Sequence, residues 1–293
     1  MARPAPGADR SVAVLELLAR HPDERFTLSE VARRCSLNKA TAHALLSALS
    51  DHGVLLRHPG EKRYSLGPRL IAIGEAARRG YKALDFVGPL LVALAERTGL
   101  WARAWQVVDD HAAPVSEAGA PAELAGAAAG TVRLPLAPPV GAPFVAWSDG
   151  PTIEAWLARS ASAEAVRPAL DALPAIRRRG FAVTLASPEW RELSVPRPPG
   201  RPAPTPDEVR RLALAVARQQ LLLAEIDEAA GYRCADVAAP VFSAAGEVEV
   251  VLSLSIPAGE VTTGAGVLAL GAALVTAAGE LTAAVRGHPP TTT

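Results

Sequence analysis

Residues 27–53, TLSEVARRCSLNKATAHALLSALSDHG, decide the fold of the N-terminal part of this chain. Thr27 and Glu30 have the spacing of a capping box, which predicts the start of a short helix. Asn38 is a good N-cap for a second helix, and Gly53 supplies its left-handed end. The second helix has one apolar face, formed by Ala42, Leu45, Leu46 and Leu49. Two helices joined by so short a turn predict a helix-turn-helix.

The segments on either side extend this prediction. Upstream, residues 12–19 repeat apolar side chains at helical spacing and stop before His21-Pro22. Downstream, residues 54–56 and 63–66 can pair as a hairpin around a turn that contains Pro59-Gly60. Together these elements predict a winged helix, with the hairpin as the wing. The alternative is a three-helix structural domain with an incidental hairpin.

A winged helix places its second helix in the major groove of double-stranded DNA and its wing against the flanking phosphates. Lys39 at the helix start is expected to contact phosphate, and His43 and Ser47 are expected to reach base edges. The predicted partner is therefore operator DNA. The candidate DNA-binding residues are Arg33, Lys39, Thr41, His43, Ser47, Arg57, Lys62 and Arg63.

The charge distribution fits two domains with different tasks. The 293 residues carry 30 basic and 30 acidic side chains, but residues 1–82 have a net charge of +6 and the remainder −6. The apolar share of 49% is ample for two cores and excludes a disordered chain. The longest nearly uncharged apolar run, residues 267–279, is shorter than the roughly 20 residues that a membrane span needs. We expect no membrane contact, no secretory signal and a cytoplasmic protein.

The remainder of the chain alternates predicted helices with antiparallel hairpins, which indicates a mixed α/β domain. An amphipathic helix that includes Phe86 is expected to end at Gly99. Residues 187–206 contain seven prolines and are followed by a long amphipathic helix over 207–230. This segment is either a surface insertion or an element with a role in assembly. The expected strands are 101–108, 112–117, 131–136, 181–185, 237–242 and 248–256, and the other expected helices are 151–157, 163–179 and 262–286.

An enzyme with a DNA-binding appendage is the alternative from another functional class. The six histidines have no HxH, HExxH or HxxxH spacing, and the two cysteines make neither a disulfide framework nor a zinc site. The chain has no G-x-S-x-G nucleophile elbow and no phosphate-binding glycine motif. We therefore predict no catalytic residues, no metal site and no cofactor.

Several motifs resemble the IclR family of bacterial transcription regulators. Residues 36–46, SLNKATAHALL, followed by Gly53 and by residues 64–67, YSLG, resemble the DNA-binding domain of that family. Lys39 and His43 match the family pattern, whereas the turn glycine is replaced by Ser36. Asn38, Ala40 and Ala44 replace a proline, a serine and an arginine. The changes at 40 and 44 remove two candidate DNA contacts, so the operator preferred by other members should not apply here.

The resemblance continues in RLPL (133–136), IRRRGFA (176–182), AAPVF (238–242) and LSLSIP (252–257). It implies an α+β fold in which an N-terminal winged helix-turn-helix (10–70) is joined by a linker helix (71–84) to a GAF-like mixed α/β domain (85–287). That last domain would bind a small-molecule effector and form a homodimer or a dimer of dimers. The alternative is a domain that binds no ligand and only dimerises.

The resemblance also implies where an effector would bind. The pocket would lie against the strand that enters the A-P-V-F motif and the Ser-x-Ser strand opposite, which here means Asp236, Ser253 and Ser255. The two serines share one face of their strand, and their hydroxyls need either a ligand or backbone carbonyls as partners. The carboxylate of Asp236 favours a neutral or cationic effector, or an anionic one met by Arg133.

Overall fold

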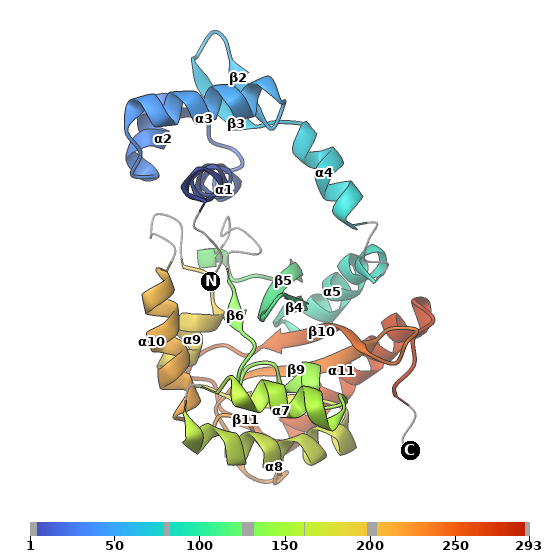
Figure 1. The fold of residues 1–293 in the computed structure, drawn as a ribbon. Helices are drawn as coiled ribbons and strands as arrows, with labels where there is room; N and C mark the ends of the chain where they lie inside the picture. The colour runs from blue at the N-terminus through green and yellow to red at the C-terminus, as the bar shows by residue number, and fades with distance from the viewer. Residues whose placement is uncertain (1–4, 79–82, 125–131, 161, 198–203, 291–293) are drawn as a thin grey trace. The chain divides into compact units, whose positions relative to one another are not determined.

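The computed structural model describes residues 5–78, 83–124, 132–160, 162–197 and 204–290. The chain divides after Tyr81 into a smaller N-terminal unit and a larger C-terminal unit, each with its own core (Figure 1). Residues 79–82 of the expected linker helix and Thr131 of an expected strand lie outside the described residues.

The smaller unit is a winged helix, as predicted. Its helices and strands are α1 (Pro6–Ala19), β1 (Phe26–Thr27), α2 (Leu28–Arg34), α3 (Lys39–Asp51), β2 (Leu55–His58), β3 (Arg63–Leu66) and α4 (Arg69–Arg78). The hairpin of β2 and β3 gains a third strand, β1, which the sequence analysis did not predict; it pairs antiparallel with β3. Seven buried residues form the core: Val14, Leu18, Phe26, Val31, Leu46, Leu55 and Tyr64.

Local hydrogen bonds position the two helices of the helix-turn-helix. The backbone N–H of Thr27 donates to Glu30 Oε2 at 2.7 Å, and the N–H of Glu30 donates to Thr27 Oγ1 at 3.3 Å. The Thr27 N–H and the Thr27 hydroxyl both donate to Glu30 Oε2, and these two bonds hold the pKa of Glu30 below its usual value. At the start of α3, Asn38 Oδ1 accepts from the N–H of Thr41 at 2.8 Å. Both caps thus satisfy backbone donors that a helix start leaves unpaired.

The larger unit is built on one antiparallel sheet with strand order β6-β5-β4-β10-β9-β7. A second sheet pairs only the short strands β8 and β11. The strands are β4 (Trp101–Val108), β5 (His111–Ala118), β6 (Leu134–Pro135), β7 (Ala182–Leu185), β8 (Gly231–Tyr232), β9 (Cys234–Phe242), β10 (Val248–Ser255) and β11 (Thr262–Thr263). The helices are α5 (Leu84–Thr98), η1 (Ala122–Leu124), α6 (Ala142–Val145), α7 (Gly150–Ala158), α8 (Ala163–Arg179), α9 (Pro188–Ser194), α10 (Pro206–Ala217) and α11 (Gly264–Ala284).

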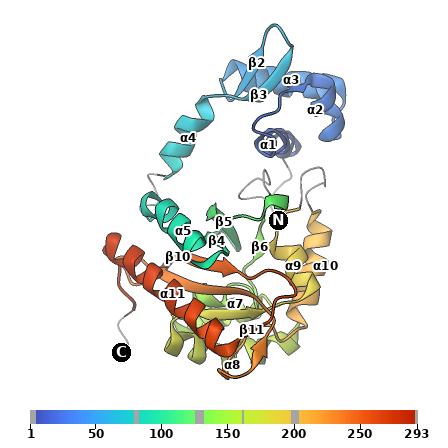
Figure 2. The same cartoon turned by 180° about the vertical axis from the view of Figure 1, so that it is seen from behind.

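Helices cover both faces of this sheet. Alternate residues of β10 point to opposite faces, so Leu252 and Leu254 pack toward α5 and α11 while Val251 packs toward the other helices. Figure 2 shows α5 and α11 against one face, and Figure 1 shows α7 and α8 on the opposite side. On α5 the expected apolar face is buried, except that Phe86 is 50% exposed. The mixed α/β prediction is therefore confirmed, with two apolar layers around one sheet.

Helix α11 is longer and more apolar than the sequence run suggested. Over Gly264–Ala284 it has the length and hydropathy that could cross a membrane, and this corrects the expectation based on residues 267–279. Its buried side chains, among them Val267, Leu274 and Leu281, belong to the core against the sheet. This packing accounts for the side of the helix that faces the sheet, and 39% of its most apolar 18-residue window is buried within the described chain.

The long helix expected over 207–230 is wrong in its second half. Helix α10 ends at Ala217, and the chain then runs along the edge of β7. There the N–H of Leu185 donates to Leu221 O at 2.7 Å, and the N–H of Leu223 donates to Val183 O at 3.1 Å. The edge strand thus satisfies backbone groups that a helix would have paired internally. The strand expected over 131–136 is also shorter, since only Leu134–Pro135 pairs with β5.

Alanine substitutions at two glycines of α11 should have opposite effects on the free energy of unfolding. A Cβ added at Gly271 would lie 2.2 Å from the Phe181 ring, whereas one added at Gly279 would meet nothing within 4 Å. Gly271→Ala should therefore lower the free energy of unfolding by about 1–3 kcal/mol through overpacking. Gly279→Ala should raise it by up to about 1 kcal/mol through helix propensity. Urea unfolding of the two variants measures both; a destabilised Gly279→Ala, or an unaffected Gly271→Ala, contradicts this packing.

Candidate functional site

Helix α3 presents a mixed basic and polar face to solvent. Ala42 and Leu46 are fully buried beneath it, and this orientation leaves Lys39 and His43 exposed. Ser47, one turn after His43, is half-buried on the same helix, and Thr41 is half-buried beside the N-cap. The face that the sequence analysis assigned to DNA is therefore accessible along the first three turns of α3.

The wing carries two exposed cations, one on β2 and one in the turn, whereas its third cation contacts other parts of the domain. Arg57 on β2 and Lys62 in the turn are exposed. Arg63 instead points back into the domain, where its Nη1 donates to Arg25 O at 2.6 Å and lies 3.4 Å from Glu30 Oε2. The guanidinium thus ties the hairpin to the start of α2.

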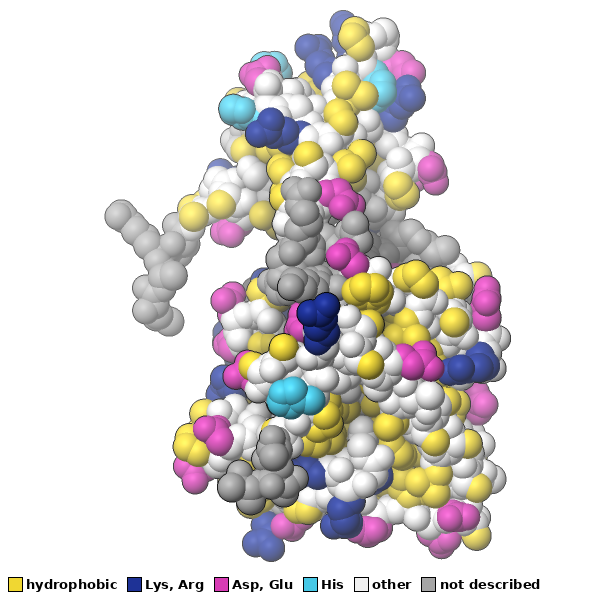
Figure 3. Space-filling view, turned by 90° about the vertical axis from the view of Figure 1, so that its right-hand side faces the viewer, with side chains coloured by type: hydrophobic (Ala, Val, Ile, Leu, Met, Phe, Trp, Pro, Cys, Tyr) yellow, Lys and Arg dark blue, Asp and Glu magenta, His cyan; other side chains and the backbone are white. Residues whose placement is uncertain are grey.

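The remaining candidate of the smaller unit, Arg33, is exposed near the end of α2. In Figure 3 basic and histidine side chains are spread over the part of the surface that the smaller unit forms, with a few acidic ones among them. This surface can offer cations to phosphates and hydrogen-bonding groups to base edges.

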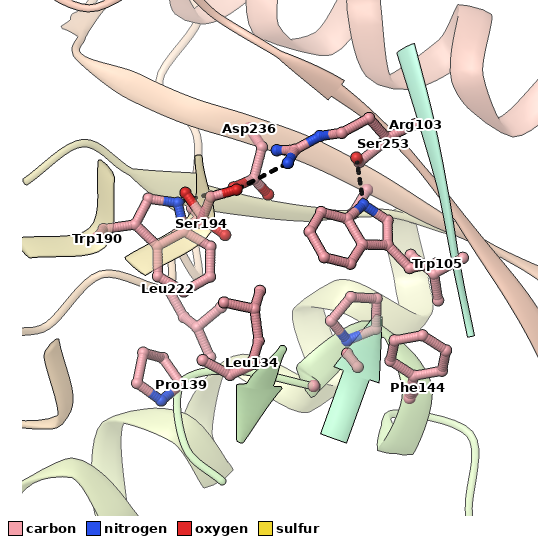
Figure 4. A pocket seen from close by; sticks show the side chains of 17 residues that line it. Arg103, Trp105, Leu134, Pro139, Phe144, Trp190, Ser194, Leu222, Asp236 and Ser253 are labelled. Carbon is pink, nitrogen blue, oxygen red and sulfur yellow. Dashed lines mark hydrogen bonds between the residues drawn. The ribbon is translucent and has the colours of Figure 1, made fainter. Parts of the chain in front are cut away.

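A cavity of about 50 Å³ lies in the larger unit against the sheet face opposite α5 and α11 (Figure 4). It has room for more than one water molecule but is smaller than a typical ligand site, which occupies about 300–1,000 Å³. One part of its wall is polar and the rest is apolar or aromatic. Its lining residues include Arg103, Trp105, Leu134, Phe144, Trp190 and Asp236.

Arg103 is a buried cation in the wall of this cavity. Its side chain lies between two tryptophan rings, 4.2 Å from the centroid of Trp101 and 4.5 Å from that of Trp105. Nη1 donates to the backbone carbonyl of Ser194 at 2.8 Å, and Nη2 donates to Ser255 Oγ at 2.9 Å. Nε is buried and has no hydrogen-bond partner among the described residues. Burial lowers the pKa of Arg103 to about 10, so the guanidinium is still charged at neutral pH.

Asp236 supplies the opposite charge. Its Oδ2 accepts from Trp190 Nε1 at 3.0 Å, and the Thr184 hydroxyl also bonds to it. Burial raises the pKa of Asp236 to about 6, although the positive charge of Arg103 acts in the other direction. Glu117, opposite Arg103 on β5, also has its pKa raised by burial and lowered in part by Arg103. One guanidinium therefore interacts with two carboxylates of perturbed acidity.

The structure brings together three of the four expected effector-site residues. Asp236 and Ser253 line the cavity, and Ser255 bonds to Arg103 beside it. Ser253 Oγ accepts from Trp105 Nε1 at 2.9 Å and Ser255 Oγ accepts from Arg103 Nη2, so side chains of β4 donate to both serine oxygens. Arg133 is exposed and is not among the lining residues.

The cation that lines the cavity is Arg103, which was not predicted from the sequence. Arg103 is the one charged residue of the strand WARAWQVV (101–108), whose other residues are apolar apart from Gln106. A lone arginine in such a strand is a signal of a buried functional or structural group, because buried charges need dedicated partners. Among the described residues, no group of three or more His, Cys, Asp or Glu side chains could hold a metal ion.

Comparison with known proteins finds a likeness to the IclR family in the smaller unit. The model of the IclR helix-turn-helix domain matches residues 7–59, which include α1, α2, α3 and the start of the wing. This part of the chain is an IclR-type helix-turn-helix domain. The glycerol operon regulatory protein of Streptomyces griseus is 38% identical over 76 residues, a match that covers 26% of this chain and 30% of that protein. The curated relatives are thus matched over only about a third of their length.

Solved structures extend the likeness in fold to nearly the whole chain. The IclR transcriptional regulator of Alicyclobacillus acidocaldarius superposes with a TM-score of 0.60 at 24% identity, covering 97% of this chain and 100% of that one. An IclR homolog of Microbacterium hydrocarbonoxydans in complex with 4-hydroxybenzoate gives 0.56 at 19% identity, covering 96% and 99%. At these identities the likeness establishes the fold.

The raised pKa of Asp236 predicts that the stability of the larger domain depends on pH. Folding raises its pKa from 3.8 to about 6, so the native state binds the proton more tightly than the unfolded chain does. The free energy of unfolding should therefore fall as the pH rises through this window. In Asp236→Asn that loss is absent, so its stability relative to wild type should increase by about 1–3 kcal/mol between about pH 4 and pH 7.

Urea unfolding at several pH values measures this difference. Glu154→Gln, which removes an exposed carboxylate from α7, is the control for a surface charge. Parallel pH profiles of wild type and Asp236→Asn would show that Asp236 titrates normally.

Proposed function

We propose that this protein is a DNA-binding transcription regulator whose affinity for its operator changes when a small molecule binds the larger domain. The observation that carries the proposal is the exposed face of α3 in a domain that matches the IclR helix-turn-helix. In this proposal residues 10–70 bind DNA, the linker helix over 71–84 transmits the change, and residues 85–287 bind the effector. The protein would act in the cytoplasm, where its DNA is.

The DNA-binding part rests on geometry and charge. Lys39 lies at the N-terminus of α3, next to the Asn38 cap, where a phosphate would be attracted both by the ammonium and by the helix dipole. His43 lies one turn further on and is exposed, so its ring can reach a base edge in the major groove. Arg57 and Lys62 on the wing are free to contact flanking phosphates, whereas Arg63 is already engaged within the domain.

The effector part rests on the cavity in the larger domain. Its wall combines an apolar portion with a buried guanidinium, a carboxylate and an indole N–H, which is the composition of a specific ligand site. The homolog of the same fold that was solved in complex with 4-hydroxybenzoate supports a small-molecule ligand for a protein of this fold. A ligand that prefers one conformation changes operator affinity by its differential binding free energy. This wall composition favours effector sensing over a domain that only dimerises.

Two further parts of the proposal follow from the family. A homodimer or a dimer of dimers would place two helix-turn-helix domains on a near-palindromic operator. The relatives are transcription regulators, which favours regulation over catalysis.

Substitutions on the exposed face of α3 should change how DNA binding depends on salt concentration. An operator fragment is first selected from a random DNA library with the wild-type protein. Lys39→Ala should then weaken binding to operator and to unrelated DNA alike, and reduce the salt slope by about one phosphate contact per site. His43→Ala should cost about 1–3 kcal/mol on the operator alone.

A salt titration of the binding constant separates these two effects. Arg211→Ala, which removes an exposed charge from α10 in the larger domain, is the matched control. Wild-type affinity in both α3 variants would mean that another surface contacts the DNA.

A further inference from the structure

Helix α9 is attached to the sheet by two hydrogen bonds at the cavity. Arg103 Nη1, on β4, donates to the carbonyl of Ser194 at 2.8 Å, and the indole of Trp190 donates to Asp236 on β9 at 3.0 Å. Trp190, Ser194 and Arg103 are each at least 93% buried. Figure 4 shows Trp190 and Ser194 on the opposite side of Asp236 from Trp105. Both contacts use charged groups that a bound polar ligand would otherwise engage.

Helix α9 lines the cavity without being part of the sheet, and its Trp190 and Leu193 side chains pack in the core. Strands β4, β9 and β10 each have a paired neighbour on both sides. In contrast, α9 has seven residues, and a helix that short is not stable without tertiary contacts. Two contacts connect α9 to α10 and to the residues that follow α10. Glu189 on α9 accepts from Gln219 at 2.9 Å. Arg197 pairs with both Glu192 on α9 and Glu208 on α10. The two helices would therefore move together.

The guanidinium of Arg103 is not fully satisfied in this arrangement. Its hydrogen bonds within the described chain go to one neutral carbonyl and one hydroxyl, and the Nε–H is buried without an acceptor. A carboxylate offers two charged oxygens in a plane that matches the guanidinium, and such charge-assisted bonds are stronger than those to neutral acceptors. An incoming carboxylate can therefore compete with the Ser194 carbonyl for Arg103.

We propose that Arg103 is the residue that selects the effector, and that it selects a carboxylate attached to an apolar body. The carboxylate takes the place of the Ser194 carbonyl on the guanidinium, and α9 is released from the sheet. The apolar body packs against Leu134, Pro139 and Phe144 on the other side of the cavity. This inference rests on the proposed effector function of the same cavity, and it reverses the preference for a neutral or cationic effector that Asp236 alone suggested.

The negative charge of Asp236 is compatible with an anionic ligand. Its pKa is raised by burial, so the carboxyl can accept a proton near neutral pH when a second anion enters. The other charged groups that act here are Arg103 and Glu117, and the Cys234 thiol, whose pKa is raised partly by Asp236, lies two residues away.

The test compares two ligands of the same shape, benzoate and the neutral benzamide, on the full-length protein. Hydrogen exchange of the backbone amides in 188–195 reports the detachment of α9. Benzoate should increase exchange in this segment and benzamide should not. Arg103→Lys, which keeps the charge but loses the planar fork, should abolish the response to benzoate.

A second variant keeps the test informative if Arg103→Lys does not fold. Trp190→Phe removes the indole donor to Asp236 and leaves Arg103 untouched. Because α9 is then held by one bond fewer, the open form is more populated, and benzoate should bind about 3- to 10-fold more tightly. Trp147→Phe, at a tryptophan that packs on Phe242 and does not line the cavity, is the matched control and should bind benzoate like wild type.

Three results would overturn this inference: no change in exchange over 188–195 with benzoate, an equal response to benzamide, or unaltered benzoate affinity in Trp190→Phe. None of these results contradicts the proposed function. That function is tested separately, because operator binding without ligand is measured on the same samples. If a compound shifts operator affinity while the amides of α9 stay protected from exchange, the proposed function is supported and the release of α9 is rejected. Loss of operator binding in wild type would reject the regulator itself.

Discussion

The larger domain is organised around one buried positive charge. A guanidinium in the centre of a sheet costs several kcal/mol of lost hydration unless its surroundings compensate. Here two tryptophan rings, a hydroxyl, a main-chain carbonyl and two carboxylates share that task around Arg103. These groups come from β4, β5, β9, β10 and α9, so a single charge links the central strands to the helix that closes the cavity. The polar chemistry of the cavity is a consequence of this arrangement.

The sequence was most informative where structure is determined by near neighbours. The capping box at Thr27, the Asn38 cap and the apolar face of α3 involve residues within one or two turns, and the winged helix followed from them. The bounds of the hairpins in the larger domain were predictable for the same reason. Strand β1 was missed, because two residues gain strand character only by pairing with Tyr64 and Arg63, which are distant in sequence.

The parts that sequence could not provide depend on distant partners. The amphipathic pattern over 207–230 predicted one helix, but residues 221–223 pair with the free edge of β7. Arg179 also donates to the carbonyls of Leu223 and Ala224 there. The role of Arg103 was equally hidden, since its acceptors lie 91 and 152 residues further along the chain. Asp236 was recognised by its place before the A-P-V-F motif, but its electrostatic surroundings were not.

The contact between Arg63 and the start of α2 has a consequence for how DNA would be read. Because this guanidinium joins the wing to Arg25 and to the Glu30 of the capping box, and β1 pairs with β3, the wing is attached to the start of α2. A domain attached in this way would keep a nearly constant distance between its contact in the groove and its contact with the DNA backbone. The duplex must then supply the adjustment, so base steps that lie between the two contacts are selected by their flexibility even though no side chain touches them.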